Sequence, residues 1–244
     1  MRGSLIVMLG SSVLLGEGFI CVLMFLPIYL FVVLLSVGTK WVKERHPSKN
    51  SKLHPIHLSP LLIGFLALEG THPDLSFERQ SSVTVQQVTS VDKAQLWANL
   101  HEPMVLNHTS SGGLSKLFPQ PVQIDIDTYE LGAVHKVHYR YARWLWTNVH
   151  EGTLELRIIG STNNAISAEV VNNSSYLANY LDIERLRLTI TDQPTGSSLV
   201  ALSIDYQRTL DPAWYFAPLM RLALEGSASH IIQTHILKEG EDND

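Results

Sequence analysis

Six short segments of alternating apolar and polar residues, followed by one long segment of helical periodicity, constrain the fold of this chain more than any other feature. Alternation is typical of strands with one buried face, and apolar residues at helical spacing are typical of an amphipathic helix. The predicted helix covers residues 213–237 and follows Asp211 and Pro212, a capping residue and a first-turn proline. The predicted strands are residues 122–129, 133–141, 153–159, 165–171, 186–191 and 198–206.

The apolar side chains of the later strands all fall on one face. Residues between them are charged or small, as Arg157, Arg187 and Ser203 illustrate. Because side chains alternate across a strand, one face of the sheet should be wet and the other covered, and the long helix can supply the cover. The apolar set is Leu154, Leu156, Ile158, Leu186, Leu188, Ile190, Val200, Leu202, Ile204 and Tyr206. The sequence therefore predicts an α+β domain.

Before these strands, residues 83–88 alternate and contain β-branched residues, which predicts a further strand. Residues 94–100 predict a short helix, with Ser90 or Asp92 as its N-cap. Residues 107–121 contain two glycines and two prolines and are predicted to be loop or broken helix.

Several diffuse motifs together resemble a known family. FPQPV leads into YELGAVHKVHY, then SYLANYL, a PTG hairpin, and IDYQRTLDPAWYF before the last helix. This order resembles the SRPBCC group of the START-like helix-grip superfamily, in particular bacterial proteins labelled polyketide cyclase/dehydrase-like. The resemblance covers about residues 80–237 and includes no catalytic signature. It implies a curved antiparallel sheet around a long C-terminal helix, with a hydrophobic cavity between them. Members bind lipids, sterols, polyketides or quinones, and a minority catalyse.

Residues 4–38 are almost uncharged, with Glu17 as the one exception. Within them, residues 19–38 have the length of a membrane-spanning helix, which Pro27 should kink. The whole stretch is either one long tilted helix or a short re-entrant arm followed by a span, and the glycines beside Glu17 favour the second. A cleaved signal peptide is the alternative, but its apolar core would be shorter.

Basic residues set the predicted orientation of this segment. Arg2 precedes it, whereas Lys40, Lys43, Arg45, Lys49 and Lys52 follow it. Positive residues stay in the cytosol, so we expect a cytosolic C-terminal domain at a membrane, which in a bacterium is the inner membrane. The same basic residues fit two roles equally well, a contact with anionic lipid headgroups or a topological stop signal alone.

The predicted organisation has four parts. Residues 1–39 form the membrane anchor, and residues 40–75 form a basic, proline-broken juxtamembrane linker. Residues 76–238 form the START-like domain, and residues 239–244 form a disordered acidic tail.

The candidate ligand-binding residues lie on the predicted inner face of the sheet and on the last helix. On strand 133–141 the inner set includes histidine and tyrosines, which either anchor a polar group of a ligand or are core residues with hydrogen-bonded tips. The candidates are His135, Val137, Tyr139, Tyr141, Leu156, Ile158, Leu188, Ile190, Leu202, Ile204, Tyr206, Tyr215 and Met220.

Other chemistries find little support in the sequence. His135 and His138 are three residues apart on a strand and therefore point to opposite faces, so we expect no metal site, and no cofactor is implied. No nucleophile elbow is present, so the catalytic residues are unknown. The formal charge is −5 and no basic surface stands out, which argues against a nucleic-acid partner. The sequence specifies no protein partner.

Three hypotheses of function remain. The preferred one is membrane-tethered binding of a hydrophobic small molecule, lipid-, polyketide- or quinone-like, with membrane lipids as further partners. The second is a cyclase or dehydratase acting on such a molecule, with His135 or Tyr139 as the titratable group. The third is a structural or chaperone-like protein with a filled interior.

Overall fold

The computed structural model describes residues 29–31, 33, 34, 36–38, 40, 41, 68, 69, 72, 75, 77–102, 104, 105, 119–126, 128–144, 147–194 and 196–238. The chain divides into two compact units. The larger comprises Glu78–Ala142, Val149–Leu210 and Trp214–Asp244, and the smaller comprises Met1–Phe77, Arg143–Asn148 and Asp211–Ala213.

In the smaller unit, the described residues between positions 29 and 41 are helical. Across the described part of the chain, no helix combines the length and the apolar character needed to span a bilayer. The predicted anchor and linker lie for the most part outside the described residues, as does the acidic tail. All three stay predictions.

The larger unit is built on one eight-stranded sheet with the order β1-β8-β7-β6-β5-β4-β3-β2. Antiparallel pairs join β1 to β8, β8 to β7, β7 to β6, β6 to β5, β4 to β3 and β3 to β2. The strands are β1 (Gln80–Thr89), β2 (Met104–Val105), β3 (Gln120–Asp125), β4 (Val134–Trp144), β5 (Thr147–Ser161), β6 (Ala165–Asn173), β7 (Leu181–Asp192) and β8 (Ser198–Arg208).

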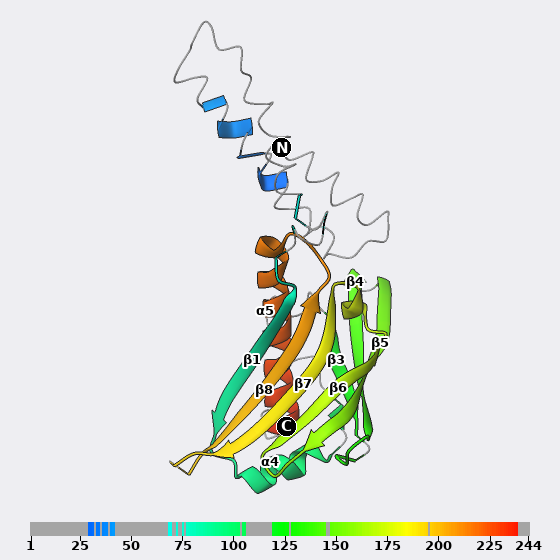
Figure 1. Ribbon diagram of the computed structural model, residues 1–244, viewed down its shortest axis with the longest axis vertical. Helices are drawn as coiled ribbons and strands as arrows, with labels where there is room; N and C mark the ends of the chain where they lie inside the picture. The colour runs from blue at the N-terminus through cyan, green and yellow to red at the C-terminus, as the bar shows by residue number, and fades with distance from the viewer. Residues whose placement is uncertain are drawn as a thin grey trace, which may run out of the picture. The chain divides into compact units, whose positions relative to one another are not determined.

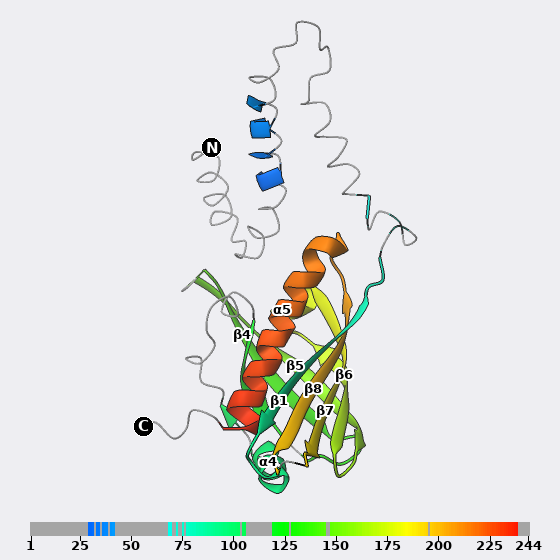
Figure 2. The ribbon, with the colours of Figure 1, turned by 90° about the vertical axis from the view of Figure 1, so that its left-hand side faces the viewer.

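Helices close the unit on one side and at one end. Helix α5 (Ala213–Ile231) lies in the curve of the sheet and continues into a single π-helical turn, η5 (Ile232–Ile236) (Figure 1; Figure 2). Helix α4 (Lys93–Leu100) lies at one end, and the 3-10 turn η4 (Tyr176–Asn179) precedes β7. This arrangement is the α+β helix-grip fold, which confirms the predicted fold class for this part of the chain.

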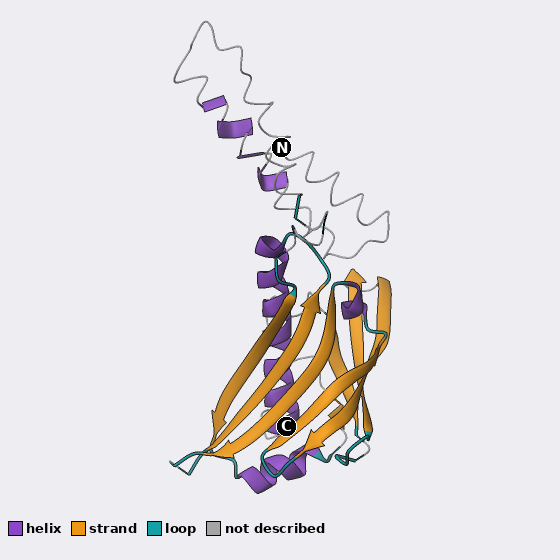
Figure 3. Ribbon diagram, viewed as in Figure 1, coloured by secondary structure: helices purple, strands orange, loops and turns teal. Residues whose placement is uncertain are grey.

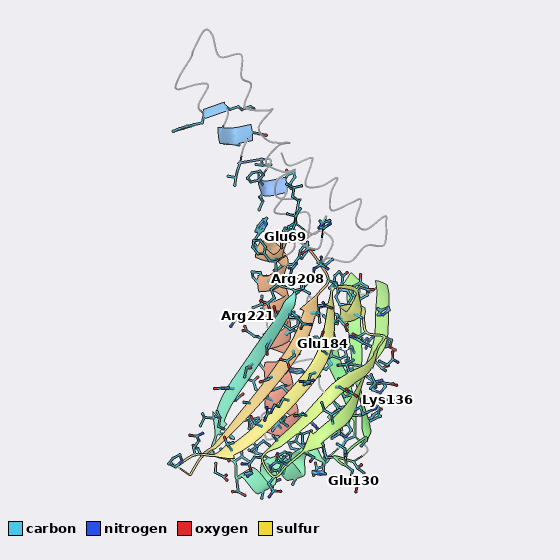
Figure 4. The ribbon with its side chains drawn as sticks, viewed as in Figure 1. Glu69, Glu130, Lys136, Glu184, Arg208 and Arg221 are labelled. Carbon is cyan, nitrogen blue, oxygen red and sulfur yellow. The ribbon has the colours of Figure 1, made fainter. Side chains whose placement is uncertain are left out.

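The two faces of the sheet differ as the alternation predicted. Helix α5 covers the inner face, whereas the outer face carries charged side chains such as Lys136 and Glu184 (Figure 3; Figure 4). On the outer face, Lys136 pairs with Glu155 at 3.4 Å and Arg157 with Glu169 at 3.4 Å. Such exposed pairs contribute little stability, so burial of the inner face is the main source of the stability of the fold.

The predicted short helix is confirmed, and its N-cap is Asp92 rather than Ser90. The Asp92 carboxylate accepts a hydrogen bond from the backbone N–H of Ala94 at 3.1 Å, which satisfies one of the free donors of the first turn.

The predicted strand 122–129 was wrong at its C-terminal end, because β3 ends at Asp125. Tyr129 lies in the following turn, where its hydroxyl donates to the backbone carbonyl of Leu100 at 2.6 Å. A tertiary contact with the end of α4 therefore takes this residue out of the ladder. Gly132 completes the turn with a positive φ of 90°, a conformation that favours glycine.

A buried amide links α4 to the C-terminal end of η5. The Asn99 side-chain N–H donates to the backbone carbonyl of Ile236 at 2.8 Å, and its oxygen accepts from Gln95 at 3.0 Å. Asn99 is 4% exposed. Because helix ends leave carbonyls without partners, this bond fixes where the C-terminal helix ends.

We expect Gly152→Ala to lower the free energy of unfolding by about 1–3 kcal/mol, since overpacking forces the neighbouring backbone to move. A Cβ at this position would lie 2.3 Å from the carbonyl oxygen of Ser174 and 2.6 Å from the Cα of Ser175. Chemical denaturation measures the effect. Gly160→Ala on the same strand is the matched control, because its Cβ would meet only the Ser167 Cβ at 3.9 Å. A Gly152→Ala protein as stable as Gly160→Ala would contradict this packing.

Candidate functional site

The structure brings the candidate residues of the sheet together on its inner face. Most of them are buried, and Leu156 and Leu188 are partly accessible. On the helix, Met220 is buried and Tyr215 is partly accessible. The buried members are His135, Val137, Tyr139, Tyr141, Ile158, Ile190, Leu202, Ile204, Tyr206 and Met220. Their contact with a ligand stays a prediction.

Accessible leucines in the middle of the inner face are the most informative feature. Leu188 lies directly between Ile166 on β6 and Leu202 on β8, and both neighbours are buried. Leu186 lies in the same way between Ala168 and Ile204, yet it is also partly accessible. A side chain flanked by strands on both sides, on the covered face of a sheet, stays accessible only if there is space above it. The inner face therefore has room over β7.

Leu186 did not appear among the candidate ligand residues, although it shares the alternation of Leu188. The same pattern could have identified it. Ala168 was also missed, because a single alanine gives no signal of burial in the sequence. It is buried in a cluster with Ile158 and Ile166, and its short side chain leaves space beside the leucines of β7.

Helix α5 presents a mixture of large and small side chains at its buried positions. Phe216, Met220 and Leu224 are large, whereas Ala223 and Ser227 are small. Helical spacing predicted which residues are buried, but it did not show that the small residues lie in the C-terminal half. Small residues bring less bulk to the interior, so that part of the helix fills less of the space inside the sheet.

Most polar groups on the inner face are already engaged. His135 Nε2 lies 2.7 Å from the carbonyl oxygen of Thr128, and its ring packs edge-on against Tyr129 at 4.7 Å. Tyr206 has its hydroxyl hydrogen-bonded to Ser81, and burial raises its pKa. These two side chains are therefore positioned by the protein itself.

Tyr139 differs from them. Among the described residues, the Tyr139 hydroxyl has no hydrogen-bond partner, and Tyr139 is 7% exposed. Burial raises the pKa of Tyr139 to about 12, so the hydroxyl stays protonated at neutral pH. A neutral hydroxyl can donate a hydrogen bond to a carbonyl or ether oxygen of a ligand.

Aromatic rings close the end of the interior next to α4. His101 and Tyr129 lie edge-on with centroids 4.7 Å apart, and Trp97 packs against the cluster around Ile158. A hollow of about 620 Å³ opens beside them and includes Asp92 among its lining residues. The Trp97 indole N–H is buried and has no hydrogen-bond partner among the residues that the structure describes.

A second hollow, of about 910 Å³, lies on the outer face of the sheet. Its lining is polar, with Asp182, Glu184, Arg185 and Asp205 among it. Burying charged groups against an apolar ligand would be costly, so this hollow does not suit a hydrophobic molecule. The inner face remains the candidate site for such a ligand.

Metal chemistry finds no support in the described residues. No group of three or more histidine, cysteine, aspartate or glutamate side chains gathers among them. His138 lies on the outer side of β4, where its Nε2 is 2.7 Å from the Asp125 carboxylate, and His135 lies on the inner side. The two histidines therefore point apart, as their spacing predicted.

We expect the stability of the protein to fall between about pH 6.5 and pH 4 because of His235. Burial, with a smaller effect of Lys238, lowers the pKa of His235 from its ordinary value of 6.5 to about 4. Between pH 6.5 and pH 4, His235 is protonated in the unfolded chain but neutral in the folded protein. The contribution of neutral His235 to the free energy of unfolding is therefore fully present above pH 6.5. It decreases by up to about 3 kcal/mol as the pH falls through 4.

Urea denaturation at a series of pH values measures this effect. His235→Gln should lose most of the decrease, whereas His101→Gln, which changes an exposed side chain, should keep it. Equal pH dependence of the wild type and His235→Gln would show that another group is responsible.

No family model matches this sequence, and no curated protein matches it. Among solved structures, a START superfamily protein from Mycobacterium smegmatis is similar, with a TM-score of 0.43 and 9% identity over 64% of this chain and 95% of the other. The ZhuI aromatase/cyclase from Streptomyces sp. R1128 has a TM-score of 0.40 and 8% identity over 65% and 93%. A truncated norcoclaurine synthase from Thalictrum flavum has a TM-score of 0.40 and 12% identity over 67% and 96%.

Proposed function

We propose that this protein binds a hydrophobic small molecule between the inner face of its sheet and helix α5, and that its N-terminal segment tethers it to a membrane. The accessible inner leucines, Leu186 and Leu188, carry the first part of the proposal. They offer apolar surface between the sheet and helix α5, where a bound molecule is removed from water.

The energetics favour an apolar guest. Burying ten methylene groups stabilises a complex by about 8 kcal/mol before the costs of association are subtracted. Inner residues of β7 and β8 supply aliphatic contacts, and few polar groups compete for the ligand. A long acyl chain, a polyketide or a prenylated ring fits this surface.

Tyr139 can orient the ligand. Its protonated hydroxyl donates a hydrogen bond, so the ligand should carry at least one acceptor, such as a quinone or ester carbonyl. His135 and Tyr206 already have partners inside the protein, so they hold the shape of the site rather than select the ligand.

Tethering complements such a site. Residues 19–38 are uncharged and long enough to cross the hydrocarbon, and the basic residues after them favour a cytosolic domain. A hydrophobic ligand concentrates in the bilayer, so a tethered domain reaches it at high local concentration.

We expect Leu188→Trp to weaken the binding of the neutral fluorophore N-phenyl-1-naphthylamine at least tenfold, because the larger ring fills the space above β7. Fluorescence titration of the full chain in detergent measures the affinity. Ile159→Trp is the matched control: Ile159 lies on the outer face of β5 and is 37% exposed. The proposal fails if Leu188→Trp binds the probe as well as Ile159→Trp does while both proteins remain folded.

Deleting residues 1–39 should move the protein from the membrane pellet to the supernatant of a carbonate wash, because the apolar segment is the proposed tether. Deleting residues 239–244 should leave it in the pellet. Quantitative immunoblots of both fractions report the distribution. Retention of the first deletion variant in the carbonate-washed pellet would exclude this segment as the tether without bearing on ligand binding.

A further inference from the structure

Strand β1 forms one edge of the sheet, and its outer backbone groups face away from the protein. The N–H of Arg208 donates to the carbonyl of Arg79 at 2.9 Å, which makes residues 79 and 208 a hydrogen-bonded pair. The register continues without a shift to Thr89. Because hydrogen-bonded and non-hydrogen-bonded pairs alternate, the odd residues of β1 bond to β8 and the even residues present their N–H and C=O groups outward.

These outward groups have no partner in the described part of the chain. The even residues are Gln80, Ser82, Thr84, Gln86 and Val88, and all five are exposed. Two of their side chains form hydrogen bonds within the sheet, Thr84 to Ser203 on β8 at 2.9 Å and Gln80 to Glu184 on β7 at 2.9 Å. Figure 2 views the molecule from the side of this edge: β1 lies in front, β8 follows on one side, and α5 passes on the other.

Strand β1 lacks the features that usually protect an edge. Its sequence, QSSVTVQQVT, has no charge and no proline, and its pairing with β8 has no bulge. Natural sheets normally protect such an edge with lysine, proline, a bulge or a short strand. The opposite edge strand, β2, has only two residues. The contrast between β1 and β2 indicates that β1 is available to pair with another strand.

We propose that β1 pairs antiparallel with β1 of a second copy of this chain, about a two-fold axis at Thr84. This register places Gln80 opposite Val88 of the second copy and Ser82 opposite Gln86, so all five outward residues meet outward residues. On the inner face, Val83 lies opposite Val85. No charged side chains oppose each other within the strands.

A closed dimer is favoured over an open-ended assembly of many copies for a topological reason. Among the described strands at the edges of the sheet, β1 is the long one, and an edge can pair with itself only through a closed two-fold contact. A head-to-tail assembly would need β2 as the other partner, and two residues offer too few hydrogen bonds. The pairing joins the two sheets and leaves each inner face as it was.

Two charged side chains of helix α5 lie beside this edge. Arg221 and Glu225 on α5 form an ion pair at 2.7 Å, and Figure 4 shows Arg221 next to β1. Because the pair is internally neutralised, it brings no net charge toward a second copy. The inference does not depend on ligand binding, since it concerns the edge of the sheet and not the inner face.

Charge exchange at position 84 tests the proposal, because the axis places this residue opposite its own copy. Two differently tagged full-length chains are co-expressed, one is captured in detergent, and the other is quantified. Wild-type chains should co-purify. Thr84→Lys in both chains should reduce co-purification at least tenfold, and Thr84→Lys in one with Thr84→Glu in the other should restore it to within about twofold of wild type.

Two further variants make the result specific. Ser203→Lys removes the same Thr84–Ser203 hydrogen bond from the inner strand β8, and in both chains it should leave co-purification unchanged. Of the backbone hydrogen-bonding groups, Thr84→Pro removes only an outward N–H, so the domain should fold while pairing is lost. The proposal is overturned if wild-type chains do not co-purify, if chains that both carry Thr84→Lys co-purify as well as wild type, or if the mixed Lys and Glu pair is not restored.

Discussion

The contact between the inner face of the sheet and helix α5 is the interaction on which the rest of this structure depends. The sheet has one charged face and one apolar face, and an apolar face of this size is stable in water only when something covers it. Helix α5 lies in the curve of the sheet and buries Phe216, Met220 and Leu224 there. The space available on the inner face follows from how completely the helix covers it.

The cover is incomplete in a specific place. Over β7, Leu186 and Leu188 stay partly accessible although their neighbours on both sides are buried. A sheet that is strongly curved encloses more volume than one helix fills, particularly where the helix carries Ala223 and Ser227. The same curvature that makes the fold stable thus creates the space that a hydrophobic guest can occupy.

The polar groups of the interior show a division of roles. Asn99 fixes the end of the C-terminal helix by its bond to Ile236, and Tyr129 holds the turn before β4 against the end of α4. Each of these groups is satisfied by the backbone, as burial requires. Tyr139 has no hydrogen bond among the described residues, and a group of that kind is more useful for recognising a ligand than for holding the fold.

Local pattern was sufficient for much of the fold. Alternation identified most strands and their buried faces, because a period of two residues assigns each side chain to a face. Helical spacing and Asp92 identified the short helix, and the sequence PTG identified the last hairpin. The resemblance of the diffuse motifs supplied the order in which sheet and helix combine.

The sequence by itself determined which residues face inward, because that choice depends on periodicity within one strand or helix. Only the tertiary structure decided the partners: that Tyr129 leaves its strand for α4, that His135 faces the Thr128 carbonyl, and that Leu186 and Leu188 keep space above them. It also decided that β1 is an edge strand. The physical reason is that pairing, contact and enclosed volume depend on segments far apart in the chain, and no local pattern encodes the distance between them.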